Sequence, residues 1–97
     1  MTIARVIIIK APEEKNKEAE RMWKEHCAPL MRRQKGCQSE KFMRSTENPD
    51  LYISYSEWDS IADIDRYRES TEHKTIQSET RAIQGSRAVV WTYEVLS

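Results

Sequence analysis

His73 is the side chain with the clearest potential for chemistry in this sequence, because an imidazole titrates near neutral pH and can act as a general base. Two interpretations of it stay open. Ile76, Thr80 and Ile83 follow His73 at spacings of three and four residues, which predicts one face of a helix. Such a face favours a histidine that starts a helix and packs against a sheet. The alternative is a base that takes a proton from a bound molecule.

Aromatic side chains are the further candidates for a binding site. A tyrosine offers a flat wall and a hydrogen-bonding hydroxyl, so we predict that Tyr67 acts with His73 as a catalytic candidate. For every aromatic residue the alternative is a position in the core or at an interface, and Trp91 in particular could face a dimer interface. The predicted substrate pocket consists of Tyr55, Trp58, Phe42 and Trp91.

No other pattern predicts a catalytic or metal site. His26 and Cys27 are neighbours whose side chains point about 100° apart on a helix, so they do not form a nucleophile and base. Two glycines cannot build a Gly-rich phosphate loop, and no metal-ligand spacing is present. We therefore predict no metal site. Arg5 and Arg44 lie in predicted strands; they could orient an anionic substrate, but ordinary ion pairs are the role we predict.

Charge and hydropathy exclude several classes of partner. Basic and acidic residues number 16 each, so the formal net charge is zero, whereas a nucleic-acid or membrane-surface binder would show a basic stripe. No apolar run approaches the roughly 20 residues of a membrane span. The N-terminus enters a β-like run without the features of a signal peptide. We expect a cytoplasmic protein with reduced thiols that binds neither nucleic acid nor membrane.

The elements that must position these residues begin with a strand over 2–10, which is rich in β-branched side chains. Its run of valine and isoleucine is apolar at both parities, which predicts that both faces are covered. A helix is predicted from Pro12 to Gly36, and Pro29 inside it predicts a kink or a break into a second piece. Its predicted buried stripe is Ala19, Met22, Trp23, Cys27, Leu30 and Met31.

The second half of the chain predicts a hairpin, two helices and a last strand. Strands over 37–46 and 51–58 flank a turn. Ser60 is predicted to cap one helix, and Ser70 or Thr71 to cap the next. Gly85 ends the second helix, and the closing strand covers 87–96. The predicted buried side of the first of these helices is Ile61, Ile64 and Tyr67.

The order β-α-β-β-α-β predicts a ferredoxin-like α+β fold, with one antiparallel sheet and the helices on one of its faces, in a single domain over 1–97. The other face would stay bare, although the first and last strands are apolar on both sides. A chain this short has no spare element to cover that face, and a large exposed apolar patch favours association. We therefore predict a homodimer with two-fold symmetry, packed sheet to sheet.

Three stretches resemble the antibiotic-biosynthesis monooxygenase domain of the dimeric α+β barrel superfamily. They are APLMRRQKGCQSEKFMRS, in which a helix end with a proline turns into a strand; NPDLYISYSEWDSIADIDRYRESTEH, with its Glu-Trp strand end and Ser-x-x-His; and the closing WTYEVL. The second stretch places Glu57, Trp58, Ser70 and His73 on the family pattern. The likeness covers nearly the whole chain, and it specifies fold better than activity.

The resemblance implies a dimer with a pocket between sheet and helices in each protomer. It implies cofactor-independent oxidation of a small aromatic, phenol or quinol by O2, with His73 as the base. Haem-degrading relatives carry an asparagine, a tryptophan and a histidine that this chain lacks: Tyr67 replaces the tryptophan, and the histidine's place is near Ile76 or Gln77. The alternatives are a non-enzymatic dimer that binds a small ligand or haem, and a structural dimer with no pocket.

Overall fold

The computed structural model describes residues 1–83 and 85–97. The predicted strands are confirmed to within two residues at each end. In chain order the elements are β1 (Ile3–Lys10), η1 (Glu13–Lys15), α1 (Asn16–Met22), η2 (Trp23–Cys27), α2 (Ala28–Arg32), β2 (Cys37–Arg44), β3 (Leu51–Trp58), α3 (Ile61–Arg68), α4 (Thr71–Ala82) and β4 (Arg87–Glu94).

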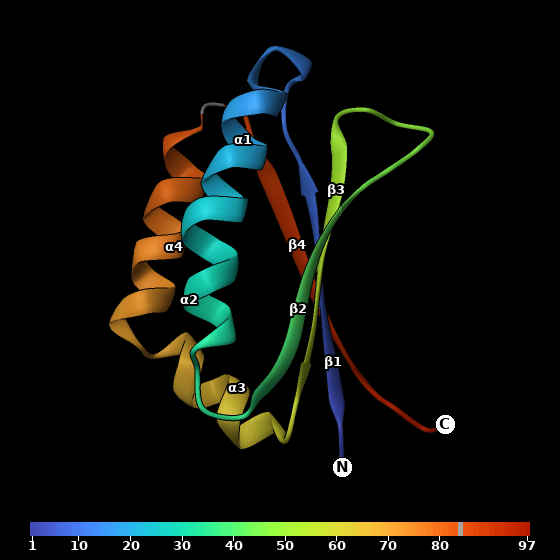
Figure 1. Cartoon of the computed structure of the whole chain (residues 1–97), viewed down its shortest axis with the longest axis vertical. Helices are drawn as coiled ribbons and strands as arrows, with labels where there is room; N and C mark the ends of the chain where they lie inside the picture. The colour runs from blue at the N-terminus through green and yellow to red at the C-terminus, as the bar shows by residue number, and fades with distance from the viewer. Residues whose placement is uncertain (84) are drawn as a thin grey trace.

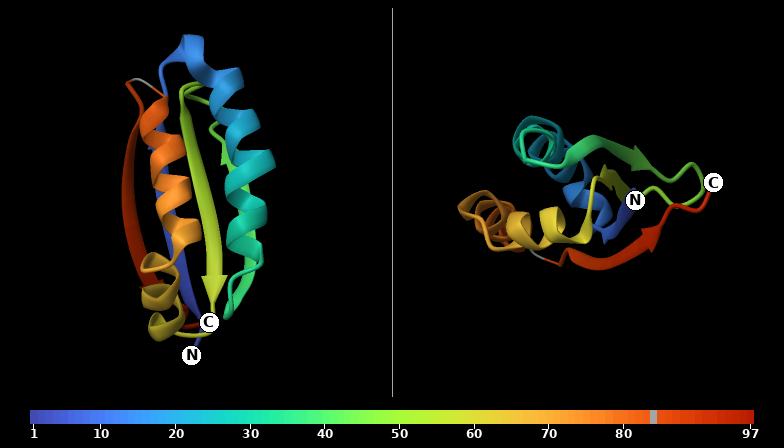
Figure 2. Two further views of the ribbon diagram at one scale, coloured as in Figure 1. Left: turned by 90° about the vertical axis from the view of Figure 1, so that its left-hand side faces the viewer. Right: turned by 90° about the horizontal axis from the view of Figure 1, so that it is seen from below.

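The strands form one antiparallel sheet in the order β2-β3-β1-β4. This order interleaves the two halves of the chain, with β1 between β3 and β4, and with β2 and β4 at the edges. All helices lie on one face of the sheet, as Figure 1 shows edge-on and Figure 2 shows from two further sides. The predicted ferredoxin-like α+β class is confirmed, because element order, pairing and helix placement all agree with it.

The long N-terminal helix changes its type before Pro29. Residues Trp23–Cys27 form a π-helical turn between α1 and α2, in which the Ala28 N–H donates to the Trp23 carbonyl five residues back. Pro29 has no N–H for the carbonyl four residues before it, so a wider turn is a physical answer to the missing donor. In place of the predicted kink or break at Pro29 the helix has this wider turn, and the rod stays continuous in Figure 2.

The predicted helix boundaries are confirmed by their caps. The Ser60 hydroxyl accepts from the Asp63 N–H, and the Ser70 hydroxyl accepts from the His73 N–H. Gly36 follows the first helix with φ +88°, a conformation that side chains other than glycine rarely adopt. A Cβ at Gly36 would also lie 2.5 Å from the Cβ of Asp63, so α3 approaches the backbone closely there.

Alternation along β3 separates the two faces of the sheet: every second residue from Tyr52 to Trp58 is buried under the helices. On β1 the helices bury Ile3, Arg5, Ile7 and Ile9. The opposite face carries large apolar side chains of β4 that stay half-exposed, namely Val89, Trp91 and Tyr93.

One predicted core residue is wrong. Ile61, expected on the buried side of α3, is 56% exposed, whereas Ile64 and Tyr67 are buried. Ile61 is the first residue of α3, and α3 lies at the end of the helical layer in Figure 1. The helical spacing is therefore correct, but the first turn of α3 has no strand beneath it to bury its apolar residue against.

Candidate functional site

A cavity of about 320 Å³ lies between α4 and the β1–β4 side of the sheet. Ala88 and Val90 of β4 are exposed, so the cavity opens to solvent along this edge strand. Its volume is at the lower end of the range for small-molecule sites. The lining residues are Arg5 and Ile7 of β1, Trp23 of the π turn, His73, Ile76, Gln77, Thr80 and Arg81 of α4, and Ser86, Arg87, Ala88 and Val90.

His73 enters this cavity from the first turn of α4. Its backbone N–H donates to the Ser70 hydroxyl at 3.1 Å, which fixes the start of the helix and with it the position of the imidazole. The ring meets the Tyr67 ring edge to face, with centroids 5.0 Å apart. Burial lowers the pKa of His73, and the positive charges of Arg5 and Arg68 lower it further. The imidazole is therefore neutral at pH 7 and able to accept a proton.

Tyr67 and Trp58 form the support beside His73. Their rings stack with centroids 5.2 Å apart, and the indole N–H of Trp58 donates to the Ser56 hydroxyl at 2.9 Å. Both side chains are buried, and neither lines the cavity. Burial raises the pKa of the Tyr67 phenol, so it stays protonated at neutral pH. Tyr67 thus touches His73, while Trp58 holds Tyr67 in place.

Arg5 differs from the prediction made for it. It is only 3% exposed, and among the described residues its Nε and Nη1 atoms have no hydrogen-bond partner. Its guanidinium carbon lies 5.6 Å from the centre of the Tyr67 ring. The predicted ion pair is therefore wrong for Arg5, whereas Arg44 does pair with Glu20 at 3.1 Å. Both arginines lie on the face of the sheet that the helices cover, but Arg44 is on the edge strand β2 and reaches Glu20 of α1, whereas Arg5 is on the interior strand β1.

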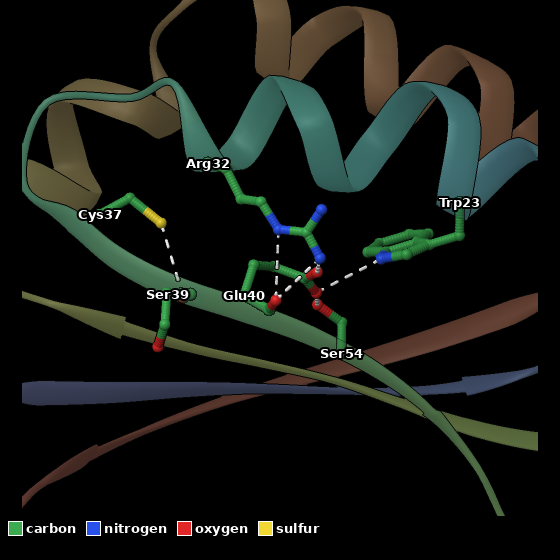
Figure 3. Close-up of polar contacts among 6 residues, drawn as sticks. All are labelled: Trp23, Arg32, Cys37, Ser39, Glu40 and Ser54. Carbon is green, nitrogen blue, oxygen red and sulfur yellow. Dashed lines mark hydrogen bonds and ion pairs between the residues drawn. The ribbon is translucent and has the colours of Figure 1, made fainter.

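Glu40 of β2 is a buried carboxylate that lies beneath the helix carrying Trp23 and Arg32 (Figure 3). No sequence pattern indicated it. Its Oε1 accepts from the Ser54 hydroxyl at 2.6 Å and from the Trp23 indole N–H at 3.4 Å. Arg32 lies 3.8 Å from Oε2 and also donates to the Glu40 backbone carbonyl at 3.0 Å. The cluster fixes Trp23, whose ring lines the cavity.

The remaining predicted pocket residues lie elsewhere. Phe42 stacks between Trp23 and Tyr52, with centroids 5.5 and 5.2 Å away, and so fills the core. Tyr55 points to the bare face of the sheet, where its hydroxyl donates to Glu57 at 2.8 Å. Trp91 lies on the same bare face. Of the residues predicted from sequence, His73 alone lines this cavity.

Three lining residues that the sequence did not place in the site are Arg5, Trp23 and Ile76. The signal for Arg5 was its parity with the apolar residues of its strand, which predicts an inward side chain. Trp23 and Ile76 were expected in the core, and they are buried. Their helical stripes indicate burial but not which buried residues border a cavity.

Other chemistry finds little support in the described part of the chain. Over residues 1–83 and 85–97, no three His, Cys, Asp or Glu side chains gather in a group that could hold a metal ion. None of the described helices is both long enough and apolar enough to cross a membrane. Both cysteines are free, and burial raises the pKa of the Cys27 thiol to about 12, which makes it a poor nucleophile at neutral pH.

Comparisons with known proteins give one family and one fold. The family model described as antibiotic biosynthesis monooxygenase matches residues 2–79. A comparison with curated protein sequences finds no significant match. Solved structures are similar over nearly the whole chain. One is a protein from Deinococcus radiodurans, provisionally an antibiotic biosynthesis monooxygenase, with 14% identity, 100% of this chain and 94% of that chain covered, and a TM-score of 0.87.

Two further structures agree. A protein from Bordetella bronchiseptica with the same provisional assignment has 18% identity, covers 99% of this chain and 98% of its own, and has a TM-score of 0.86. A conserved protein from Methanosarcina mazei has 20% identity, covers 96% of this chain and 92% of its own, and has a TM-score of 0.79. At these identities the likeness establishes the fold and leaves the chemistry to the residues of this chain.

Proposed function

The chain belongs to the antibiotic biosynthesis monooxygenase family, and on that premise we propose that it is a cofactor-independent monooxygenase that oxidises a small phenol or quinol with O2. Family membership and the similar structures support a monooxygenase-like or small-ligand-binding module. The substrate class and the role of His73 are the proposal. One observation carries it: a neutral imidazole stands at the wall of a largely apolar cavity that opens to solvent.

The proposed reaction starts with proton transfer from the substrate hydroxyl to His73. The phenolate passes one electron to O2, and the resulting phenoxyl radical and superoxide combine in a carbon–oxygen bond. The peroxide takes back the proton from His73 and then loses water, which leaves a quinone. One oxygen atom enters the ring and the other leaves as water, so every electron comes from the substrate and no external reductant is needed.

Oxygen uptake by the purified protein with 1-naphthol, corrected for the rate without protein, tests this function. We expect His73→Gln to lower kcat/KM by roughly 100-fold or more, the usual contribution of a general base. The matched control is His26→Gln, because His26 is the second histidine, lies on the exposed side of the first helix and should leave the rate unchanged. A full rate in His73→Gln, or no uptake above background, would contradict the proposal.

We also propose that two copies pack with the bare faces of their sheets together. The support is the exposure of Val89, Trp91 and Tyr93 on that face, where no element of the same chain covers them in the described structure. Isologous contact between two such faces would bury them at once. Sedimentation velocity of Trp91→Glu should show a monomer and that of Ile61→Glu a dimer, since both side chains are equally exposed but Ile61 lies on the helical side. A monomeric parent protein at micromolar concentration would refute the dimer.

The second candidate is a module that binds a small ligand, or haem, without turnover. The observation that favours it is that no carboxylate lines the cavity to orient His73, as an acid usually orients a histidine base. Titration with haemin would produce a Soret band that saturates at one haem per protomer if haem is the ligand. Binding of 1-naphthol without oxygen uptake would favour this candidate over the oxygenase.

A further inference from the structure

The buried charge of Arg5 is the feature that indicates a ligand. A buried charge without a partner is costly, and proteins normally supply a carboxylate or several hydrogen bonds for it. Arg5 has neither for its Nε and Nη1 atoms among the described residues, and its contact with the Tyr67 ring is the weaker cation–π kind. Nε and Nη1 are buried without a partner, and Arg5 forms part of the cavity wall.

The lining of the cavity has a single sign of charge. Arg81 and Arg87 lie at its exposed rim and Arg5 at its buried wall, while no Asp or Glu is part of the lining. Between these charges the wall is apolar, formed by Ile7, Ile76 and Val90 together with the Trp23 ring. A concave site with arginines and flat apolar walls, and with no acid, is complementary to an anion that carries a ring system.

The buried acid in the same cross-strand row is engaged elsewhere. Arg5 of β1 and Glu40 of β2 both pair with Ser56 of β3. The carboxylate of Glu40 accepts hydrogen bonds from Ser54 and Trp23 and forms an ion pair with Arg32. Neither this row nor the cavity lining therefore supplies an anion for Arg5.

We propose that the cavity binds a flat, apolar organic anion whose oxyanion, a carboxylate or a phenolate, accepts hydrogen bonds from the Arg5 guanidinium. This rests on the proposed use of the cavity as the substrate site, and it narrows the substrate class from neutral phenols to molecules that are anionic when bound. Arg5 and His73 both line the cavity and both contact Tyr67, and the charge of Arg5 helps to lower the pKa of His73. When His73 takes a proton from the ligand, the negative charge that forms on the ligand oxygen is stabilised by the positive charge of Arg5. Arg5 is then a binding residue, with His73 as the base.

Calorimetric titration without O2 tests the inference independently of turnover. The ligands are 2-naphthoate, which is a fixed anion at pH 7, its neutral analogue 2-naphthamide, and 2-naphthol. We expect 2-naphthoate to bind about 10- to 100-fold more tightly than the amide, as for a charged hydrogen bond. Arg5→Met should abolish this preference, and Arg5→Lys should keep part of it, since lysine keeps the charge but loses the planar fork.

The rim arginines provide the control. Arg81→Gln and Arg87→Gln should keep most of the preference, because exposed charges are screened by solvent. Binding of 2-naphthol with the absorption spectrum of its phenolate, and not of the phenol, would support a phenolate as the bound form. Equal affinity for naphthoate and naphthamide, or a preference that survives Arg5→Met, would overturn the inference. Anion binding without oxygen uptake would refute the oxygenase and leave this inference standing.

Discussion

Arg5 and Glu40 are two buried charges in one cross-strand row, on either side of Ser56, and the fold treats them in opposite ways. Glu40 lies under the rod of α1, η2 and α2, from which Trp23 and Arg32 reach its oxygens. Arg5 lies toward α4 and the edge strand β4, where a cavity remains. Glu40 accepts two hydrogen bonds on Oε1 and has an ion pair with Arg32 on Oε2, which makes no hydrogen bond, whereas Arg5 has no ion pair among the described residues.

Glu40 therefore has a structural role, whereas Arg5 is available for function. A charge that is fully engaged stabilises one arrangement of its neighbours, whereas a charge left without partners lowers stability unless a ligand completes it. The helical layer over β2 and β3 is filled by the stacked rings of Trp23, Phe42 and Tyr52. The layer over β1 and β4 is open. Substitutions in each region test whether the two buried charges differ in this way.

The largest effect is expected for Glu40→Ala. The substitution leaves the Trp23 indole N–H and the Ser54 hydroxyl buried without an acceptor and creates a void, so the free energy of unfolding should fall by about 3 kcal/mol. Urea denaturation measures it. Glu47→Ala, a change of an exposed loop residue, should stay within about 0.5 kcal/mol of the parent protein. Equal stability of the two variants would mean that Glu40 is not a structural charge.

The next effect in size is expected for Trp23→Phe, which touches both regions. It removes the hydrogen bond to Glu40 and part of the ring stack, and we expect a loss of about 2 kcal/mol in the free energy of unfolding. Combined with Glu40→Ala in a double-mutant cycle, the two losses should sum to more than the loss in the double variant, because the shared hydrogen bond is counted twice. Additive losses would show that the 3.4 Å contact carries no coupling energy.

Arg5→Met should have the opposite sign. Replacing an unpartnered buried charge by an apolar side chain of similar length should raise the free energy of unfolding by about 1 kcal/mol. Arg44→Met is the matched control on the same face, where loss of an exposed ion pair should change stability by at most about 0.5 kcal/mol. A loss of more than about 1 kcal/mol in Arg5→Met would mean that Arg5, like Glu40, is compensated by the chain.

The smallest effect is the pH dependence that His73 contributes. Its pKa is lower in the folded protein than the value of 6.5 for an unperturbed histidine, so below about pH 6.5 the unfolded chain binds a proton that the folded chain does not. Stability from this group is fully present above that pH and is lost as pH falls through the folded pKa. Denaturation between pH 7.5 and 5 should therefore show a steeper decline for the parent protein than for His73→Gln. Identical slopes would place His73 in a solvent-like environment.

The sequence carried most of the fold because its signals are local. Positive-φ glycine at Gly36, the caps at Ser60 and Ser70, and the apolar strands each fix a boundary from a few neighbouring residues. The prediction for Ile61 was wrong for the complementary reason. Periodicity indicates which face of a helix is apolar, but only the tertiary position of the first turn decides whether that face is covered.

The site was predicted less well, since it depends on which elements meet. Phe42 and Trp91 are both strand aromatics, and their positions in the sequence do not distinguish a filled core from a bare face or from a cavity. Arg5 was assigned an ion pair because most strand arginines have one. Its inward parity was visible, but the absence of a facing acid depends on the register of β2 and β3 and on the place of α4.

The π turn at Trp23–Cys27 has a consequence for helical phase. Ala19 and Met31 both face the sheet, yet they are twelve residues apart. At about 100° per residue, an unbroken α-helix would rotate Met31 about 120° away from the direction of Ala19. A turn that holds one extra residue reduces the mismatch to about 20°. The extra residue therefore works as an angular correction: Pro29 interrupts the hydrogen bonds of the helix, yet α1 and α2 both keep their buried residues toward the sheet.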